Sequence, residues 1–138
     1  TAYADGCRTI LSTFHANGVT ILAGTDANVP VAVPGFSLHD EMRSMHRVGM
    51  TPRAVLQSAT RLPGEWLGRR PGSLREGYKA NVVVLAETPL LDISHTRSIQ
   101  AVIANGRYFD RATLDEMLRA VKAANDASRT IDIKPYVE

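Results

Sequence analysis

The sequence predicts an α/β protein, and three observations support this fold class. A helical hydrophobic pattern around residues 7–14 is followed by a glycine turn and a short apolar run at residues 19–23, which is a typical step from a helix to a buried strand. Helical patterns then continue as far as residue 68. Beyond residue 69 the pattern changes to the period of two that strands show.

The composition is that of an ordinary globular protein and excludes several functional classes. The 138 residues, 44% of them hydrophobic and 22% charged, suffice for one domain with a hydrophobic core. A net charge of +2 is too small to indicate binding to nucleic acid or to an acidic membrane surface. No apolar run approaches the roughly 20 residues of a membrane-spanning helix. We therefore expect neither a nucleic-acid nor a membrane partner.

The single cysteine, Cys7, excludes an intrachain disulfide and a CxxC metal site. One cysteine suits a reducing compartment, and in the absence of a signal peptide we expect a cytoplasmic protein. The chain begins at Thr1 instead of Met, inside an expected helix. We therefore expect it to be part of a longer protein, a processed product or a trimmed chain.

The first helix and strand lead to the first candidate for chemistry, Asp26. The helix is predicted to stop at Asn17 and Gly18, which tolerate the left-handed conformation. Residues 19–28, VTILAGTDAN, then have the pattern of a buried strand. Such a strand delivers Asp26 to its C-terminal end, where ligands lie in α/β proteins. The alternative is a turn aspartate, since aspartate is common where strands stop.

The loop after Asp26 contains Pro30, Pro34 and Gly35, which forbid a regular element. Loops in this position usually supply substrate contacts in barrel enzymes. Ser37 is predicted to cap the next helix, with Asp40 at the capping-box position.

Two histidines lie on the helix that begins near residue 37. His46 is expected on the surface, and seven residues separate it from His39, so the two are too distant to share a metal by themselves. His39 lies in the first turn and is a candidate to face the cavity below the preceding loop. The buried side of this helix is predicted to consist of Leu38, Met42 and Met45.

A further helix is predicted from Thr51, with Pro52 at its first position. Its buried face should consist of Val55, Leu56 and Ala59. Leu62 and Pro63 are expected to interrupt it before a last turn in which Trp66 packs on the core.

The remainder is predicted to be a small β unit followed by a helix. Strands are expected over residues 72–74 and 80–86 and on both sides of Asn105–Gly106, which is the strongest short hairpin signal. Thr113 with Glu116 is predicted to cap a final helix, and the chain should be extended or frayed from residue 126. The stripe of that helix is Leu114, Met117, Leu118 and Val121.

Four blocks in this order resemble the C-terminal part of the metal-dependent amidohydrolases, nearest to their prolidase-like and imidazolonepropionase-like branch. One GTDA strand end would be a weak signal, but four ordered blocks over about residues 19–111 are specific. The blocks are TILAGTDAN, GFSLHDEMRSMHRVGMTPRAVLQSAT, GSLREGYKANVVVLAETPLLDI and IQAVIANGRYFDR.

The resemblance implies a fold and a division of the chain. The family fold is a (β/α)8 TIM barrel whose flanking segments combine into a small β-sandwich. Residues 1–69 would be the end of the barrel, with its last strand and the helices that follow. Residues 70–111 would be sandwich strands, and residues 112–138 a C-terminal helix and tail. The chain has Asn81 where the family often has Asp, a position without a catalytic role.

The resemblance also implies a reaction and its residues. The parent would be a hydrolase of carbon–nitrogen bonds in a small-molecule substrate, with a divalent metal, zinc by expectation. Asp26 matches the last-strand aspartate that binds this metal and takes the proton from water. His39 matches a histidine that is common after the last strand in this family, and we assign it as a substrate-binding residue.

The chain alone is not expected to be active. A catalytic zinc takes about three protein ligands, and the family supplies the others from segments that this chain lacks. Open strand edges would favour a homo-oligomer or a domain-swapped assembly, unless the missing part is present as another chain. The alternatives are a non-catalytic binding or scaffold domain and an aspartate-based phosphotransferase. The latter wants a second acidic residue near Asp26, where the chain has Asn28.

Overall fold

A computed structural model describes residues 2–27, 32–68 and 72–130 of the chain. They form an α/β structure with one three-stranded sheet, so the predicted fold class is confirmed at this level. In chain order the elements are α1 (Ala2–Ala16), α2 (Ser37–Arg47), α3 (Pro52–Ala59), α4 (Arg61–Trp66), β1 (Val82–Leu85), the 3-10 helix η1 (Ile93–Arg97), β2 (Ile99–Ala104), β3 (Arg107–Asp110) and α5 (Arg111–Ser128).

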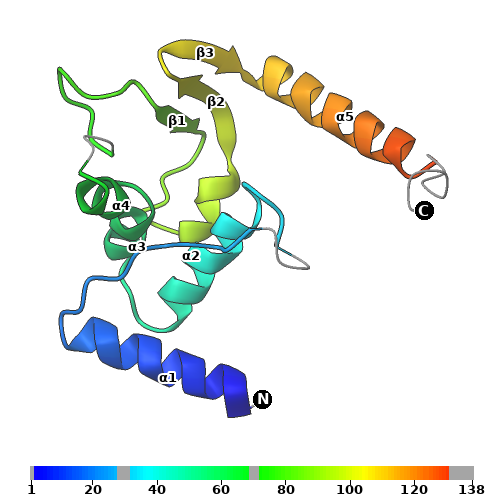
Figure 1. Ribbon diagram of the computed structural model, residues 1–138. Coiled ribbons are helices and arrows are strands. Elements are labelled where there is room, and N and C mark those ends of the chain that lie inside the picture. Colours follow the sequence, from blue (N-terminus) through cyan, green and yellow to red (C-terminus); the bar gives the residue numbers. More distant parts are fainter. Residues whose placement is uncertain (1, 28–31, 69–71, 131–138) are drawn as a thin grey trace.

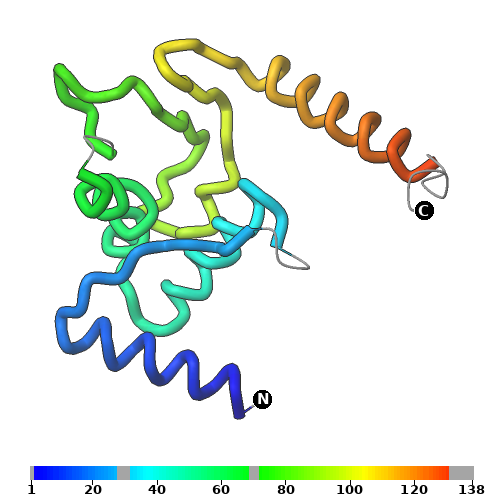
Figure 2. Tube along the Cα trace, in the orientation of Figure 1, coloured from blue at the N-terminus to red at the C-terminus, as the bar shows by residue number. Residues whose placement is uncertain are grey.

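The elements are arranged as a central helical cluster with a helix on either side. Helices α2, α3 and α4 lie together with η1, and α1 and α5 lie on opposite sides of this cluster (Figure 1). The sheet β1–β2–β3 connects the cluster to α5. Figure 2 shows the chain leaving α1, crossing the helical cluster and turning back into α2. Within the described ranges, no helix has both the length and the apolar character needed to cross a bilayer.

The hydrophobic core lies between α2, α3 and η1. The predicted buried side of α2 is confirmed for Met42 and Met45, which are 5% and 4% exposed, and Leu38 packs against them. Val55 of α3 is fully buried, and its predicted companions are partly buried against the same cluster. Met50 and Ile93 complete the cluster.

The predicted strand over residues 19–28 is not formed in the described part of this segment. Residues 19–26 belong to no strand, although Ile21 and Ala23 do pack against the core. A strand requires a ladder of backbone hydrogen bonds to a neighbour, and the described chain offers this segment none. Instead, single bonds from two successive amides hold it to α3 and α2.

The predicted helix starts are right at α3 and wrong at α2 and α5. Thr51 caps α3 by accepting a hydrogen bond from the Ala54 amide at 3.2 Å. At α2 the cap position belongs to Phe36, no side chain caps the helix, and the Ser37 hydroxyl accepts from the preceding Val33 amide at 2.8 Å. At α5 the cap is Asp110, whose carboxylate accepts from the Thr113 amide at 2.8 Å.

Three further predictions fail at or near the ends of helices. Trp66 does not pack on the core but is 76% exposed, because it is the last residue of the six-residue α4 and faces solvent. The expected break at Leu62 and Pro63 falls earlier, at Thr60, where φ is −131° and ψ is −79°. Helix α5 continues through Asp126 to Ser128 instead of fraying at residue 126.

The sheet is antiparallel, and its hairpin is as predicted. Strand β2 pairs with β1 and β3, with Val102 opposite both Val83 and Phe109. Asn105 and Gly106 have φ values of 50° and 80°, which the tight type I′ hairpin turn requires. The Asn81 side-chain oxygen accepts from the Asn105 amide at 2.7 Å and fastens this turn to β1.

The predicted strand over residues 72–74 is absent for a local reason. Gly72 has φ of +73°, and a Cβ atom there would lie 2.6 Å from the Arg61 Cα atom. A left-handed residue pressed against the start of α4 cannot continue a strand. The predicted loop with Pro30, the start of the β unit after residue 69 and the last part of the tail expected from residue 126 lie wholly or partly outside the described residues.

Candidate active site

Asp26 lies at the end of the segment that crosses the helical cluster. Its side chain belongs to an exposed residue, and its backbone is left-handed, with φ of 48°. Positive φ is uncommon outside glycine, although aspartate tolerates it better than most residues. The chain therefore turns sharply at this residue and presents the carboxylate to solvent.

The Asp26 carboxylate is not used to hold the described structure together. Within residues 2–27, 32–68 and 72–130, it makes no hydrogen bond and no ion pair. A structural ion pair or a helix cap made by Asp26 is thus not observed in this part of the chain. The carboxylate remains available as a ligand or as a base.

Glu41 of α2 is a residue that the sequence analysis missed. Its Oε1 atom accepts a hydrogen bond from the Gly24 amide at 2.8 Å, two residues before Asp26. Its Oε2 atom is buried without a hydrogen-bond partner among the described residues. A signal was present, because Glu41 interrupts the apolar stripe of Leu38, Met42 and Met45 at the i+3 position.

His39, the second predicted site residue, is half-buried in the first turn of α2. Its Nδ1 atom lies 3.0 Å from the Thr96 hydroxyl oxygen. That hydroxyl already donates its only proton to the Ile93 carbonyl at 2.9 Å, so Nδ1–H must be the donor to Thr96. When the imidazole is neutral, this network therefore places the proton on Nδ1 and the lone pair on Nε2.

The surroundings of His39 keep its imidazole neutral. Burial is the main cause that lowers the pKa of His39, and the nearby Arg97 cation lowers it further, against a smaller opposite effect of Asp40. The Asp40 carboxylate itself bridges Arg43 at 2.7 Å and Arg97 at 2.8 Å. These ion pairs tie α2 to η1 at the surface.

The structure does not bring Asp26 and His39 together. No hydrogen bond joins them, and His39 faces an open groove of about 500 Å³ whose lining does not include Asp26. The groove lies between the start of α2, β2 and α5, and its lining is mostly apolar. Besides His39 it is lined by Gly35, Phe36, Arg97, Ile99, Val102, Arg111, Leu114, Met117, Leu118 and Val121.

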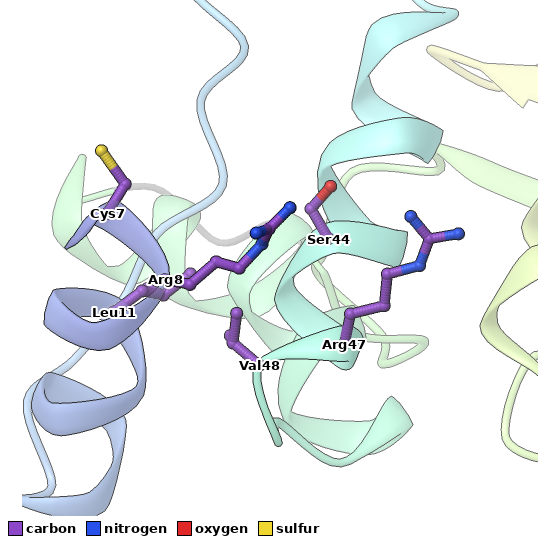
Figure 3. Close-up of a pocket in the computed structure, with 6 residues that line it drawn as sticks. All are labelled: Cys7, Arg8, Leu11, Ser44, Arg47 and Val48. Carbon is purple, nitrogen blue, oxygen red and sulfur yellow. The ribbon is translucent and has the colours of Figure 1, made fainter. Parts of the chain in front are cut away.

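A smaller hollow of about 200 Å³ lies between α1 and α2 (Figure 3). Its lining includes Arg8 and Arg47, but Figure 3 shows the Arg47 side chain extending away from Arg8. The Arg8 guanidinium is already paired with Asp5 at 2.7 Å. The two cations therefore do not converge on one anion site.

The described residues do not form a complete metal centre. They contain no group of three or more His, Cys, Asp or Glu side chains that could hold a metal ion. Asp26 fits the role of one ligand, because its carboxylate is exposed and makes no other bond in the described part of the chain.

Comparison with known proteins defines the class. The model of the amidohydrolase family matches residues 3–108, and the chain belongs to this family. The resemblance inferred from the four sequence blocks is thereby confirmed. Among curated proteins, ochratoxinase of Aspergillus niger is 38% identical over 89 residues, which are 62% of this chain and 18% of that protein.

Solved structures agree with this assignment. A Xaa-Pro dipeptidase with methionine in its active site matches with a TM-score of 0.67 at 28% identity, over 75% of this chain and 25% of that one. The A. niger ochratoxinase structure gives 0.64 at 31% identity, over 79% and 26%. Molinate hydrolase gives 0.66 at 25% identity, over 72% and 25%. The chain thus spans about a fifth to a quarter of the length of these relatives.

Proposed function

We propose that this chain is the C-terminal segment of a metal-dependent hydrolase of carbon–nitrogen bonds. In this proposal it contributes the end of a (β/α)8 barrel and part of a β-sandwich, and the crossing segment at residues 19–26 is the last barrel strand. The family match supports the class of enzyme. The single observation that carries the site is the exposed Asp26 carboxylate, which makes no bond to the described residues.

Asp26 has two tasks in this proposal. Its carboxylate is one ligand of a divalent metal, for which we propose zinc. When bound, such a metal makes water nucleophilic near neutral pH. Asp26 then accepts a proton from the attacking water and passes it to the leaving nitrogen, as a general base followed by a general acid.

His39 is proposed to act on the substrate side. Its neutral imidazole donates a hydrogen bond from Nδ1–H to the Thr96 hydroxyl, and the lone pair on Nε2 can accept a hydrogen bond from a substrate. In the described structure no hydrogen bond joins His39 to Asp26, and the groove that His39 lines does not include Asp26. The role of His39 is therefore a binding role and not a proton transfer.

The substrate is proposed to be a small molecule with an amide, cyclic amide or dipeptide-like bond. The names of the relatives support this range, since they include an ochratoxinase and a Xaa-Pro dipeptidase. The chain alone is proposed to be inactive, because a catalytic zinc needs about three protein ligands and Asp26 is the one that the described residues offer. A homo-oligomer is also proposed, supported by exposed apolar side chains such as Phe14 of α1 and Leu118 of α5, which are 49% and 47% exposed.

The test uses the whole enzyme that contains this chain, loaded with zinc. Hydrolysis of an ochratoxin, a Xaa-Pro dipeptide and molinate is compared between wild type and Asp26→Asn. We expect kcat/KM to fall at least about 100-fold and the bound zinc to decrease when measured by elemental analysis. Asp126→Asn, on the exposed end of α5, is the matched control.

Two results would overturn the proposal. Wild-type activity and metal content in Asp26→Asn would remove the role of this carboxylate and favour a non-catalytic binding or scaffold domain. Metal-dependent hydrolysis by the purified chain alone would contradict its proposed inactivity.

A further inference from the structure

The segment that carries Asp26 is attached to the helical cluster by two bonds from neighbouring residues. The Ala23 amide donates to the Ser58 carbonyl of α3 at 3.0 Å. The Gly24 amide donates to the Glu41 carboxylate of α2 at 2.8 Å. Successive amides of an extended chain point in opposite directions, so these two bonds hold the segment from both sides.

The position of Glu41 is energetically unfavourable, and hydrophobic packing does not explain it. It lies in the apolar stripe of α2, and its Oε2 atom is buried without a hydrogen-bond partner among the described residues. A buried carboxylate oxygen that lacks a donor is unfavourable, whereas leucine or methionine at that position would pack without this penalty. The bond to Gly24 is therefore the feature that accounts for a carboxylate here.

The hydrogen bond between Gly24 and Glu41 lies two residues before Asp26, the proposed metal ligand. Between Gly24 and Asp26 there is only Thr25, and Asp26 itself has a left-handed φ of 48°. The Gly24 bond is therefore the attachment nearest to Asp26 along the backbone, and no bond within the described residues holds the Asp26 side chain itself. Metal and proton chemistry require such a group to be fixed within about 0.5 Å.

We infer that Glu41 is a positioning residue for Asp26: its carboxylate clamps the Gly24 amide and so fixes the direction in which the chain presents the Asp26 side chain. This inference rests on the proposed function of Asp26. Glu41 touches neither metal nor substrate in it. It acts through the backbone, and an acceptor oxygen at its position is sufficient.

Glu41→Leu and Glu41→Gln separate positioning from a merely structural role. Leucine completes the apolar stripe and removes the acceptor, so the whole enzyme should remain at least as stable against thermal unfolding while kcat falls about 10- to 100-fold. KM should change less than about threefold, because substrate contacts are untouched. Glutamine keeps an acceptor oxygen and should retain kcat within about threefold of wild type.

A second measurement does not depend on the reaction. Amide hydrogen exchange in the purified chain, followed by NMR, should be at least about tenfold faster at Gly24 in Glu41→Leu, with the Ala23 amide unchanged. Glu116→Leu on α5 is the matched control, because this exposed carboxylate pairs with Arg119 of the same helix at 2.9 Å and has no part in the clamp. It should leave kcat close to that of wild type.

The outcomes distinguish this inference from the proposed function. If Asp26→Asn is inactive but Glu41→Leu keeps wild-type kcat, the positioning role is wrong and the function stands. If kcat and stability fall together in Glu41→Leu and glutamine does not rescue, Glu41 is only structural. If Asp26→Asn retains full activity, both the function and the inference fail.

Discussion

The helical cluster and the last helix have similar sequence patterns but different surroundings. Val55 of α3 is fully buried, and Met45 of α2 is 4% exposed. Helix α5 has no buried residue, and in its predicted stripe Met117 is 45% exposed and Val121 is 67% exposed. The amphipathic patterns therefore predicted where the helices form. They did not predict that other described elements would bury the apolar stripes of α2 and α3 but leave that of α5 exposed.

The reason is that burial needs a second element at the right place. Helix α2 packs against α3 and η1, whose Ile93 enters the same cluster. Helix α5 leaves the end of β3 and extends away from the cluster (Figure 1). Contiguous exposed apolar side chains, such as Met117, Leu118 and Val121 on α5, commonly mark interaction surfaces.

The same substitution in the two regions gives the largest expected effect. Met45→Ala should lower the free energy of unfolding by about 2–5 kcal/mol, because it leaves a cavity in a packed core. Met117→Ala, the matched control, should change it by less than about 0.5 kcal/mol. Both are measured by urea denaturation of protein dilute enough to be monomeric by light scattering. Similar costs at the two positions would show that the face of α5 is covered in solution and would remove the contrast.

A charge on the α5 stripe sharpens the comparison at higher protein concentration. Leu118→Lys should weaken self-association about tenfold or more, because a lysine in an apolar interface loses its hydration. The fold of the monomer should be unaffected, since Leu118 is 47% exposed. Light scattering across a dilution series measures the change. Wild-type protein that stays monomeric at all concentrations would contradict the proposed homo-oligomer.

The smallest expected effect is the pH dependence that His39 contributes to the cluster. Its pKa is lowered in the folded state, chiefly by burial, so the unfolded chain binds more protons below the ordinary histidine pKa of about 6.5. This contribution to stability is thus present above that pKa and is lost as the pH falls below it.

His39→Gln should therefore reduce the loss of melting temperature between pH 7.5 and pH 5.5. Thermal unfolding followed by circular dichroism measures it, and His15→Gln on α1 controls for the removal of one histidine. An unchanged pH profile in His39→Gln would show that protonation of this imidazole is equally easy in both states.

Local chemistry made much of the fold predictable. Asn105 and Gly106 specify their hairpin turn by themselves, and Thr51 with Pro52 specifies the start of α3. The failed predictions depend on distant residues. Trp66 is 76% exposed and outside the described core, although α4 lies beside α3. The expected strand at residues 19–28 needs ladder partners that periodicity cannot supply.

The candidate site also contains one residue that local sequence predicts and one that depends on a distant part of the chain. Asp26 was found from the pattern of an apolar run that ends in a carboxylate, and the structure leaves it exposed. Glu41 was not found, because its significance depends on the Gly24 amide, 17 residues earlier in the chain. A carboxylate inside an apolar helical stripe is the one sequence signal that pointed to it.

The two-sided attachment of residues 23 and 24 has a consequence for assembly. Within the described residues, the amides of Thr20, Ile21 and Leu22 make no backbone hydrogen bond. The segment thus already runs in the direction of a strand while its pairing groups are still unsatisfied. Strands arriving beside it could add by ordinary main-chain pairing at these three amides, without first breaking a backbone hydrogen bond that they make in the described chain.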